Sequence, residues 1–332
     1  MLPSPGHDPS GAPPFEATGA RLSGLSQKRP LVSVIIPVFN RAKTLAAALG
    51  SVAEQTFPDW EAVVVDDGSS DESAAVALRI GHPGKVRVVR HKRNQGPSAA
   101  RNSGILAARG RYVSFLDSDD SWHPEKLSRQ LALVEADPNP DMVFCATQTR
   151  VCRGGGRVRV LPKRAPFSDE PWCEFLYVNG GFAQTNSFFL SRDLAMKVGF
   201  RPSVLQHEDH LFFLDAGAHG ARYRLITEPL SNWNNDSRTD RMGLAADFER
   251  SCRYLEEANG LLTDKARLAF KVRYLGPGLF KQSPLGAMKL FRKASTNGAV
   301  LRRHLLAVSL RCVLPAPAVT TLKRLLMGAN WL

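Results

Sequence analysis

Apolar runs and amphipathic stretches alternate regularly through the first half of the chain. The run LVSVII at 31–36 stops at Pro37 and predicts a buried strand. In the stretch that follows, Leu45, Leu49 and Val52 recur at helical spacing, which predicts an amphipathic helix. The alternation continues with predicted strands at 62–66, 86–90, 111–116 and 142–147, and with predicted helices after Ser70 and Asp71, from Pro97 to Gly110 and from Pro124. Strands that alternate with helices of this length predict an α/β fold with a parallel sheet and right-handed crossovers.

The pattern changes from about residue 150. We predict a basic hairpin with a glycine turn at 150–164, a strand at 184–190 and a short helix at 207–220 that turns Phe212, Phe213 and Ala216 inward. We expect this second half to pack onto the first half and to hold a second substrate.

These patterns divide the chain into three parts. Residues 1–29 are rich in Pro, Gly and Ser and are expected to be disordered. A catalytic domain is predicted at 30–240, with one half at 30–147 and the other at 148–240. Residues 241–332 are predicted to form a basic helical extension, since Leu, Val and Phe interleave there with Lys and Arg.

Most of the net charge of +13 lies near the C-terminal end, because residues 251–332 contain 14 Lys and Arg against 3 Asp and Glu, which gives 14 − 3 = +11. Basic helices with interleaved apolar residues are typical of segments that lie on an anionic membrane surface. A helical cap on the catalytic core with a solvated basic face explains the same pattern, and the sequence leaves both interpretations open.

Composition and cysteine content favour a globular cytoplasmic protein. In 332 residues, 43% are hydrophobic, which is ample for a core. The 5 cysteines have no metal-ligand spacing and are expected to be mostly reduced. We expect neither a signal peptide nor a membrane-spanning run, because no apolar stretch reaches about 18 residues. A peripheral position at the inner face of the membrane follows if the basic helices bind lipid.

Unusual polar residues fall at the predicted carboxyl ends of the strands. Asn40 follows the first strand, Asp66 and Asp67 end the second, and the stretch 117–120 follows the strand at 111–116. Ligands of such sheets bind beyond the carboxyl ends of the strands, so these residues should converge on one crevice. An Asp side chain at the second strand end could accept hydrogen bonds from a nucleobase or ribose, although the same residues are ordinary turn and cap residues.

Three carboxylates crowd into the stretch FLDSDDSWHP at 115–124. A solvated loop or a helix cap explains them in part, and we interpret Asp120 as a turn or cap residue before the helix from Pro124. A Mg²⁺ or Mn²⁺ ion would relieve the repulsion, since such ions are held by one or two carboxylates together with substrate phosphates. If the segment is extended, Asp117 and Asp119 point the same way, which predicts a metal and diphosphate site.

Two further charged positions suggest chemistry. Arg101 lies near the first turn of a predicted helix, where a cation gains nothing from the helix dipole, so an anion such as phosphate is a better explanation than packing alone. Glu208 and Asp209 suit the first turn of a helix, but a carboxylate presented there could also take a proton from an incoming hydroxyl.

Five segments resemble, in order and spacing, the family 2 glycosyltransferases of the GT-A fold: VSVIIPVFNR (32–41), VVVDDGSSD (63–71), NQGPSAARNSGI (94–105), YVSFLDSDD (112–120) and HED (207–209). The resemblance covers roughly residues 31–235. It implies a Rossmann-like, mostly parallel sheet flanked by helices, here with a C-terminal helical extension. It also implies an inverting, divalent-cation-dependent transfer from a nucleotide diphosphate sugar, expected to be UDP-linked, to an acceptor hydroxyl, in cell-surface polysaccharide or glycolipid biosynthesis.

The resemblance assigns roles position by position. Asp209 would be the catalytic base, and Asp117 and Asp119 would frame a Mn²⁺ or Mg²⁺ ion and the diphosphate. The nucleotide sugar would contact Pro37, Phe39, Asn40, Asp67, Arg101, Asp117 and Ser118, with Pro37 and Phe39 lining the base pocket and Asp67 bonding the base.

Two departures from the family pattern sharpen the expectation. The chain lacks the Gln-x-x-Arg-Trp motif of processive synthases, which predicts transfer of a single sugar. Many relatives carry a histidine beyond the base, whereas residues 229–241 contain none. Asn234, Asp236 or Arg238 would substitute for it, and Trp122, Glu208, Asn234 and Arg238 are expected to contact the acceptor or the diphosphate.

Other functions fit the sequence less well. A nucleotidyltransferase also combines a doubly wound sheet with acidic metal ligands, but PVFNRAKT after the first strand is not a glycine-rich loop. An inactive relative that only binds a nucleotide sugar is the other alternative. Nucleic-acid binding is disfavoured, because acidic strand ends repel phosphate and no aromatic and basic platform is present.

Overall fold

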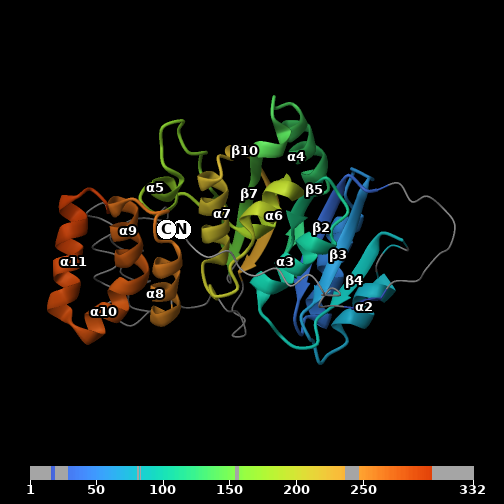
Figure 1. The fold of residues 1–332 in the computed structure, drawn as a ribbon, viewed down its shortest axis with the longest axis horizontal. Coiled ribbons are helices and arrows are strands. Elements are labelled where there is room, and N and C mark those ends of the chain that lie inside the picture. Colours follow the sequence, from blue (N-terminus) through green and yellow to red (C-terminus); the bar gives the residue numbers. More distant parts are fainter. Residues whose placement is uncertain are drawn as a thin grey trace, which may run out of the picture.

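The structure is a computed structural model that describes residues 16–18, 29–80, 82, 84–153, 157–235 and 247–300. It is a mixed α/β fold in which a curled, mostly parallel sheet is flanked by helices (Figure 1). The strand order is β1-β4-β3-β2-β5-β9-β7-β10-β6, and β8 pairs with β7. This arrangement confirms the predicted fold class.

Four parallel strands form the first half of the sheet. They are β2 (Val32–Val38), β3 (Trp60–Asp66), β4 (Val86–Arg90) and β5 (Tyr112–Phe115). The helices between them and after them are α1 (Ala42–Ala53), α2 (Ser73–Ile80), α3 (Pro97–Ala107) and α4 (Lys126–Glu135). These elements confirm the alternating pattern that the sequence predicts.

The last strand of the predicted parallel series runs in the expected direction but does not pair with the strand before it. β9 (Phe189–Ser191) lies between β5 and β7 (Val143–Arg153) and is antiparallel to both. Beyond β7, β10 (Arg222–Asn235) runs parallel to it, and β6 (Ser121–Trp122) pairs with β10. A local apolar pattern indicates that a strand exists but not which strand becomes its neighbour, which is why the insertion of β9 was missed.

The remaining predictions for the second half have mixed outcomes. β7 and β8 (Arg157–Leu161) form the expected hairpin. Helix α7 (Glu208–Ala218) buries Phe212, Phe213 and Ala216 as expected. The strand predicted at 184–190 is wrong in its first part, where Thr185–Ser187 form a 3₁₀ turn, η2. Short elements complete this half: η1 (Pro140–Met142), α5 (Trp172–Tyr177) and α6 (Arg192–Val198).

Each face of the sheet has its own apolar core. Successive residues of a strand point to opposite faces, so Ile36 joins α1 and α4 on one side while Ile35 joins α3, α6 and α7 on the other. Helix α3 lies very close to the sheet, because a Cβ added to Gly104 would come within 2.3 Å of Ile35 Cγ2. This close contact fixes the helix that carries Arg101.

The C-terminal extension continues the core beyond α7 (Figure 1). It comprises α8 (Phe248–Glu257), α9 (Asp264–Phe270), the π-helical segment η3 (Lys271–Leu275), α10 (Gly276–Gln282) and α11 (Pro284–Thr296). Tyr254, Phe270 and Ala287 belong to the same apolar cluster as Phe212. The cap interpretation therefore holds for α8 to α11, and lipid contact by their outer surface stays a prediction.

Parts of the sequence predictions fall outside the described residues. They include most of residues 1–29, although Glu16–Thr18 form a strand, β1, beside β4. The helices predicted beyond residue 300 are likewise not described. Among the helices that are described, none combines the length and apolar character needed to cross a bilayer.

Candidate active site

The carboxyl ends of three neighbouring strands bring the predicted site residues to one edge of the sheet. Val38 of β2 is level with Asp66 of β3, and Asp67 donates its backbone N–H to Val38 O at 2.8 Å. On the other side of β2, β5 runs parallel and leads directly into the turn that begins at Asp117. The strand ends therefore lie at one edge of the sheet, as expected, and a crevice between them stays a prediction.

Asn40 joins the loops that follow β2 and β3. Its φ of 53° lies in the left-handed region, which Asn tolerates better than most residues. Its Oδ1 accepts a hydrogen bond from Ser70 N at 2.9 Å, and its backbone N–H donates to Ser69 Oγ at 3.0 Å. The side chain therefore shapes the loop, while the neighbouring Phe39 is 42% exposed and Pro37 is half-buried.

Asp67 is buried and organises the loop after β4. Its carboxylate accepts hydrogen bonds from Gln95 N at 2.9 Å and Gly96 N at 2.7 Å, and it contacts His91 Nδ1 at 2.6 Å. The other ring nitrogen of His91 lies 2.9 Å from Ser103 Oγ on α3. These contacts use three of the about four lone-pair sites of the carboxylate, so a bond from Asp67 to a nucleobase stays a prediction.

His91 was missed by sequence reasoning, and its only signal is its position directly after β4.

The turn after β3 is constrained at Gly68, which has a φ of 75°. A Cβ at Gly68 would lie 2.7 Å from the backbone carbon of Arg93, so only glycine allows the two loops to approach this closely.

The acidic residues 117–120 form a tight turn. Asp120 N donates to Asp117 O at 3.0 Å, so the segment is not extended, and the argument that alternate residues share a face does not apply. Asp117 keeps 27% of its side chain exposed, Asp119 is half-buried, and Ser118 between them is buried. The backbone carbonyl of Asp119 accepts a hydrogen bond from Asn234 Nδ2 at 2.8 Å.

Within the described residues, no group of three or more His, Cys, Asp or Glu side chains is placed to hold a metal ion. Two carboxylates on one turn do suit a Mg²⁺ or Mn²⁺ ion that takes its other ligands from substrate phosphates and water. Asn234, one of the three candidates for the third contact, ties β10 to this turn. The other two, Asp236 and Arg238, lie outside the described residues.

Asp120 is part of this turn, as the sequence suggested, but it does not cap α4. It is 2% exposed and accepts hydrogen bonds from Gln184 Nε2, Asn186 Nδ2 and Asn234 N at 3.2, 2.8 and 2.9 Å. Burial, followed by the charges of Asp117 and Asp119, raises its pKa well above the ordinary value. Asp120 therefore fastens the acidic turn to η2 and β10, and α4 begins without a side-chain cap.

Trp122 is also internal, which corrects the expectation that it contacts the acceptor or the diphosphate. It is 3% exposed, and its indole N–H donates to Asn186 O at 2.8 Å. The ammonium group of the buried Lys126 lies 3.9 Å from the centre of the ring. Burial lowers the pKa of Lys126 well below its usual value. Lys126 Nζ also donates to Ser114 Oγ at 3.0 Å and to Gln130 Oε1 at 2.6 Å, so both side chains are engaged inside the protein.

Arg101 connects the acidic turn with α7. Its guanidinium donates to Asp117 Oδ1 at 2.8 Å and to Glu208 Oε1 at 3.2 Å, and 5% of the side chain is exposed. Burial alone would lower its pKa, but the charges of Asp117 and Glu208 outweigh burial and raise it. The anions that Arg101 meets within the protein are therefore two carboxylates, and Glu208, expected at the acceptor or the diphosphate, is its partner.

Asp209 follows in the first turn of α7. Its Oδ1 accepts a hydrogen bond from His210 N at 2.8 Å. Burial raises its pKa to about 6, with the charge of Asp117 adding to the rise, while the hydrogen bond from His210 N and the charge of Arg101 oppose it. The side chain is 22% exposed. A carboxylate with this pKa is ionised at neutral pH and is still basic enough to accept a proton.

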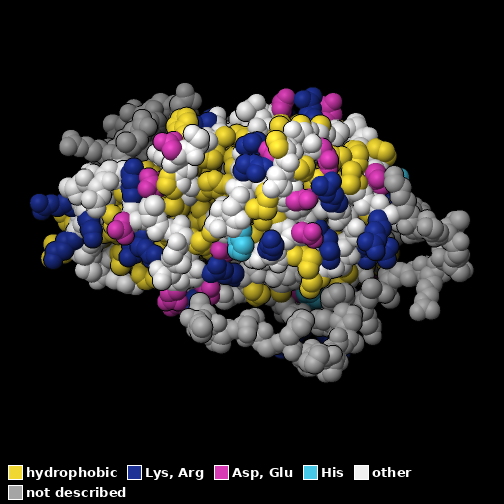
Figure 2. Space-filling model, turned by 45° about the horizontal axis from the view of Figure 1, so that its top comes forward, with side chains coloured by type: hydrophobic (Ala, Val, Ile, Leu, Met, Phe, Trp, Pro, Cys, Tyr) yellow, Lys and Arg dark blue, Asp and Glu magenta, His cyan; other side chains and the backbone are white. Residues whose placement is uncertain are grey.

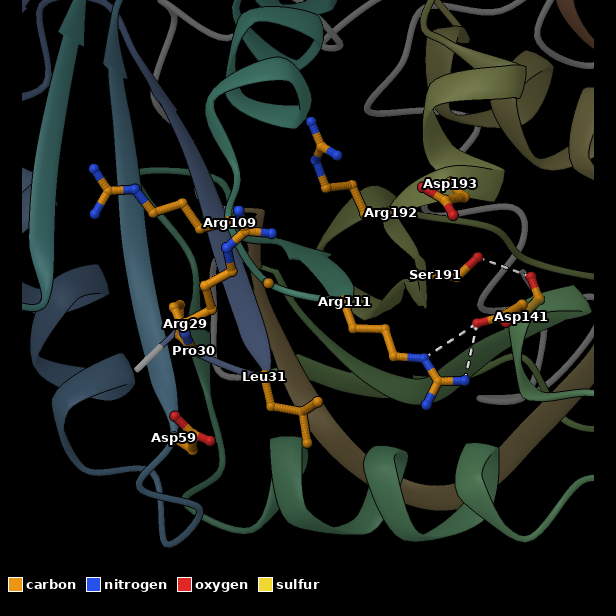
Figure 3. Close-up of a pocket in the computed structure, with 11 residues that line it drawn as sticks. Arg29, Pro30, Leu31, Asp59, Arg109, Arg111, Asp141, Ser191, Arg192 and Asp193 are labelled. Carbon is orange, nitrogen blue, oxygen red and sulfur yellow. Dashed lines mark hydrogen bonds and ion pairs between the residues drawn. The ribbon is translucent and has the colours of Figure 1, made fainter. Parts of the chain in front are cut away.

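A separate pocket of about 600 Å³ lies at the opposite edge of the sheet (Figure 3). Its lining includes Leu31, Asp59 and Arg111, which precede β2, β3 and β5. Figure 3 shows Arg111 turned toward Asp141, with which it forms an ion pair at 3.2 Å. Because the predicted catalytic residues follow the other ends of these strands, this pocket is not the candidate active site.

Comparison with known proteins gives a consistent family. The family model described as glycosyl transferase family 2 matches residues 33–195. The amylovoran biosynthesis glycosyltransferase AmsB of Erwinia amylovora is 28% identical over 78% of this chain and 89% of that protein. The Escherichia coli protein named UDP-Glc:alpha-D-GlcNAc-diphosphoundecaprenol beta-1,3-glucosyltransferase WfgD is 36% identical over 31% of this chain and 41% of its own length.

A solved structure shares the fold over most of the chain. The structure of S. aureus TarS 1–349 in complex with UDP-GlcNAc matches with a TM-score of 0.60 and 21% identity, over 84% of this chain and 85% of that one. The family match and this likeness agree with the GT-A fold.

The buried position of Arg101 predicts a large loss of stability when it is removed. Arg101→Ala should lower the free energy of unfolding by about 3 kcal/mol, since it leaves two partly buried carboxylates without their cation. Arg111→Ala is a matched control, because Arg111 also bridges two carboxylates but is 46% exposed. It should cost under about 1 kcal/mol in the same urea denaturation experiment. Equal losses for the two variants would contradict this description of Arg101.

Proposed function

Because the chain belongs to glycosyl transferase family 2 and has the GT-A fold, we propose that it is an inverting enzyme that transfers one sugar from a nucleotide diphosphate sugar to an acceptor hydroxyl. The observation that carries this proposal is the position of Arg101. Its guanidinium joins Asp117, at the expected donor side, to Glu208, the neighbour of Asp209. The acidic turn and the helix start that carries the base are thereby held on either side of one buried cation, Arg101.

On the donor side, Asp117 and Asp119 would hold a Mn²⁺ or Mg²⁺ ion together with the diphosphate. When bound, the ion offsets the negative charge that develops on the leaving diphosphate. Arg101 adds a fixed positive charge beside Asp117, and Asp120 keeps the turn in place through its contacts to η2 and β10. Phe39, exposed beyond β2, would contact the nucleobase together with Pro37.

On the acceptor side, Asp209 would remove the proton from the attacking hydroxyl. The oxygen then forms a bond to C1 of the sugar as the bond from C1 to the diphosphate oxygen breaks, and the electron pair leaves with the nucleotide. Attack from the face opposite the leaving group inverts the anomeric centre. The pKa of about 6 supports Asp209 in this role, because the group is both ionised and proton-accepting at neutral pH.

We infer the chemical classes of donor and acceptor from the names of the relatives. We take the donor to be UDP-linked, as in the name of WfgD, and the acceptor to be a glycan or glycolipid in surface polysaccharide biosynthesis, as the names of WfgD and AmsB suggest for those proteins. Single-sugar transfer at the cytoplasmic face of the membrane is the simplest arrangement for such an acceptor. A cytoplasmic location, with peripheral contact to the membrane, belongs to the same proposal.

The outer surface of the extension supports the peripheral contact. Leu285 and Met288 on α11 are 66% and 61% exposed. Figure 2 shows Lys and Arg side chains beside hydrophobic ones at the end of the molecule where α10 and α11 lie. Residues 265–300 contain no Asp or Glu and eight cations: Lys265, Arg267, Lys271, Arg273, Lys281, Lys289, Arg292 and Lys293. Exposed apolar side chains among cations suit an anionic lipid surface.

Substitution of the base tests the mechanism. Asp209→Asn should bind a nucleotide sugar as wild type does but lower kcat by roughly 10²- to 10⁴-fold, because it cannot accept a proton. In the wild type, kcat/KM should rise with pH through an apparent pKa of about 6, since only ionised Asp209 is active, and the variant should lose this rise. Wild-type rates in Asp209→Asn would remove the residue from the mechanism.

Substitution in the acidic turn tests the metal site. Asp119→Ala should lose the Mn²⁺-dependent part of donor binding, measured as the rise in melting temperature that UDP-sugars and Mn²⁺ produce together. Asp193→Ala, at an exposed carboxylate on α6, is the control and should keep the full shift. An unchanged Mn²⁺-dependent shift in Asp119→Ala would exclude Asp119 as a ligand.

Lipid contact is tested on α11. Replacing Leu285 and Met288 together by Glu should weaken binding to vesicles that contain phosphatidylglycerol by at least about tenfold, since both apolar contact and charge attraction are lost. Leu78→Glu on α2 is the control, because Leu78 is 56% exposed at a distant helix. Vesicle sedimentation that is equal for all three proteins would disprove contact through α11.

A further inference from the structure

The π-helical segment η3 reaches the start of the helix that carries Asp209. The ring of Tyr274 in η3 lies 4.4 Å from the ring of His207, which in turn lies 5.4 Å from the ring of His210. His210 Nε2 is 3.9 Å from Asp209 Oδ1. Segments of π-helix are rare and often occur at functional sites, so the side chains that η3 presents beside Asp209 are candidates for a role.

Of the two cations in η3, Lys271 and Arg273, the second lies beside the Tyr274 ring. It is exposed, and its guanidinium lies 5.3 Å from the centre of the Tyr274 ring. Among the residues that the structure describes, it has neither a hydrogen-bond partner nor an ion-pair partner. Arg101 and Arg201, in contrast, are each paired with carboxylates. Arg273 is thus an unpaired cation beside Tyr274, whose ring packs against His207, two residues before the proposed base.

The charge of Arg273 acts on the start of α7. Burial lowers the pKa of His207 to about 2 and that of His210 to about 3, and the positive charge of Arg273 contributes to both. Both rings are therefore neutral at pH 7. Of the two carboxylates in this turn, Glu208 is paired with Arg101, and Asp209 is the proposed base. Neither of these two carboxylates forms an ion pair with Arg273.

Tyr274, whose ring lies beside the Arg273 guanidinium, carries a hydroxyl that can donate a hydrogen bond. Burial and the charge of Asp209 raise the pKa of Tyr274, although Arg273 opposes them, so the hydroxyl keeps its proton at neutral pH. A guanidinium matches the oxygens of a phosphate in a bidentate manner, and a phenol beside it donates one more hydrogen bond.

We propose that Arg273 and Tyr274 form an acceptor subsite in which Arg273 binds a phosphate group that the acceptor carries close to its reacting sugar. The inference rests on the proposed function, since it names the class of acceptor that Asp209 deprotonates. A glycosyl phosphate or diphosphate has this chemistry, whether it is attached to a lipid or free.

Direct binding tests the subsite without turnover. The full-length chain, without donor or metal, is titrated with an alkyl N-acetylglucosaminyl diphosphate and with the matching uncharged alkyl glycoside, using calorimetry. Arg273→Ala should weaken binding of the diphosphate at least tenfold and leave binding of the glycoside unchanged. Arg273→Lys should recover part of the affinity, because it keeps the charge but loses the bidentate geometry.

Controls separate the subsite from general electrostatics. Lys271→Ala removes the same charge from the same segment and should change the dissociation constant less than twofold. Equal affinity of wild type and Arg273→Ala for the diphosphate, or equal weakening for both probes, would overturn the inference. A wild type that binds the diphosphate but transfers no sugar from any UDP-sugar would overturn the proposed function instead.

The tail-less N-acetylglucosaminyl diphosphate distinguishes the two sources of the phosphate. If the tail-less form binds as tightly as the alkyl form and Arg273→Ala weakens both equally, the subsite recognises the phosphate group and not the lipid. If it binds more weakly but stays sensitive to Arg273→Ala, a lipid-linked acceptor is indicated. Insensitivity of both forms to Arg273→Ala counts against the subsite.

Discussion

One buried guanidinium holds the two halves of the candidate active site together. Arg101 is fixed from behind, because Gly104 lets α3 lie directly against Ile35 of β2. From there it binds Asp117 of the acidic turn and Glu208 at the start of α7. The turn and the helix belong to different halves of the domain, and this cation joins them by one hydrogen bond to each. The pKa of Asp209 depends on it too, since the charge of Arg101 opposes the effect of burial.

The C-terminal extension holds α7 from its other side. Tyr177 OH lies 3.1 Å from His210 Nδ1 and 2.6 Å from Tyr254 OH on α8. Phe270 packs against Tyr254 with the ring centres 4.7 Å apart. The start of α7, which carries the proposed base, is therefore held on one side by Arg101 of α3 and on the other by Tyr177 and the aromatic side chains of the extension. This arrangement explains why the extension shares its apolar core with the catalytic domain, and it allows η3 to contribute to the acceptor side.

The sequence predicted features that local patterns encode and missed those that depend on distant pairing. The four parallel strands, α7 and the positions of Asp117, Arg101 and Asp209 were predictable, because strand ends, helix starts and charge placement are local properties. The insertion of β9 was not, nor was the burial of Asp120, whose partners come from η2 and β10. Trp122 was misjudged for the same reason. In the sequence, a carboxylate that binds a substrate cannot be distinguished from one that binds a neighbouring strand.

The central claim is that Asp209 and the acidic turn act from opposite sides of the reacting carbon. The most direct measurement is the anomeric configuration of the product formed from an α-linked UDP-sugar, read from the coupling between H1 and H2 in its proton NMR spectrum. The account predicts a β-linked product, because the acceptor attacks opposite the leaving diphosphate. An α-linked product would contradict it, since retention requires a different relation between the base, the sugar and the leaving group.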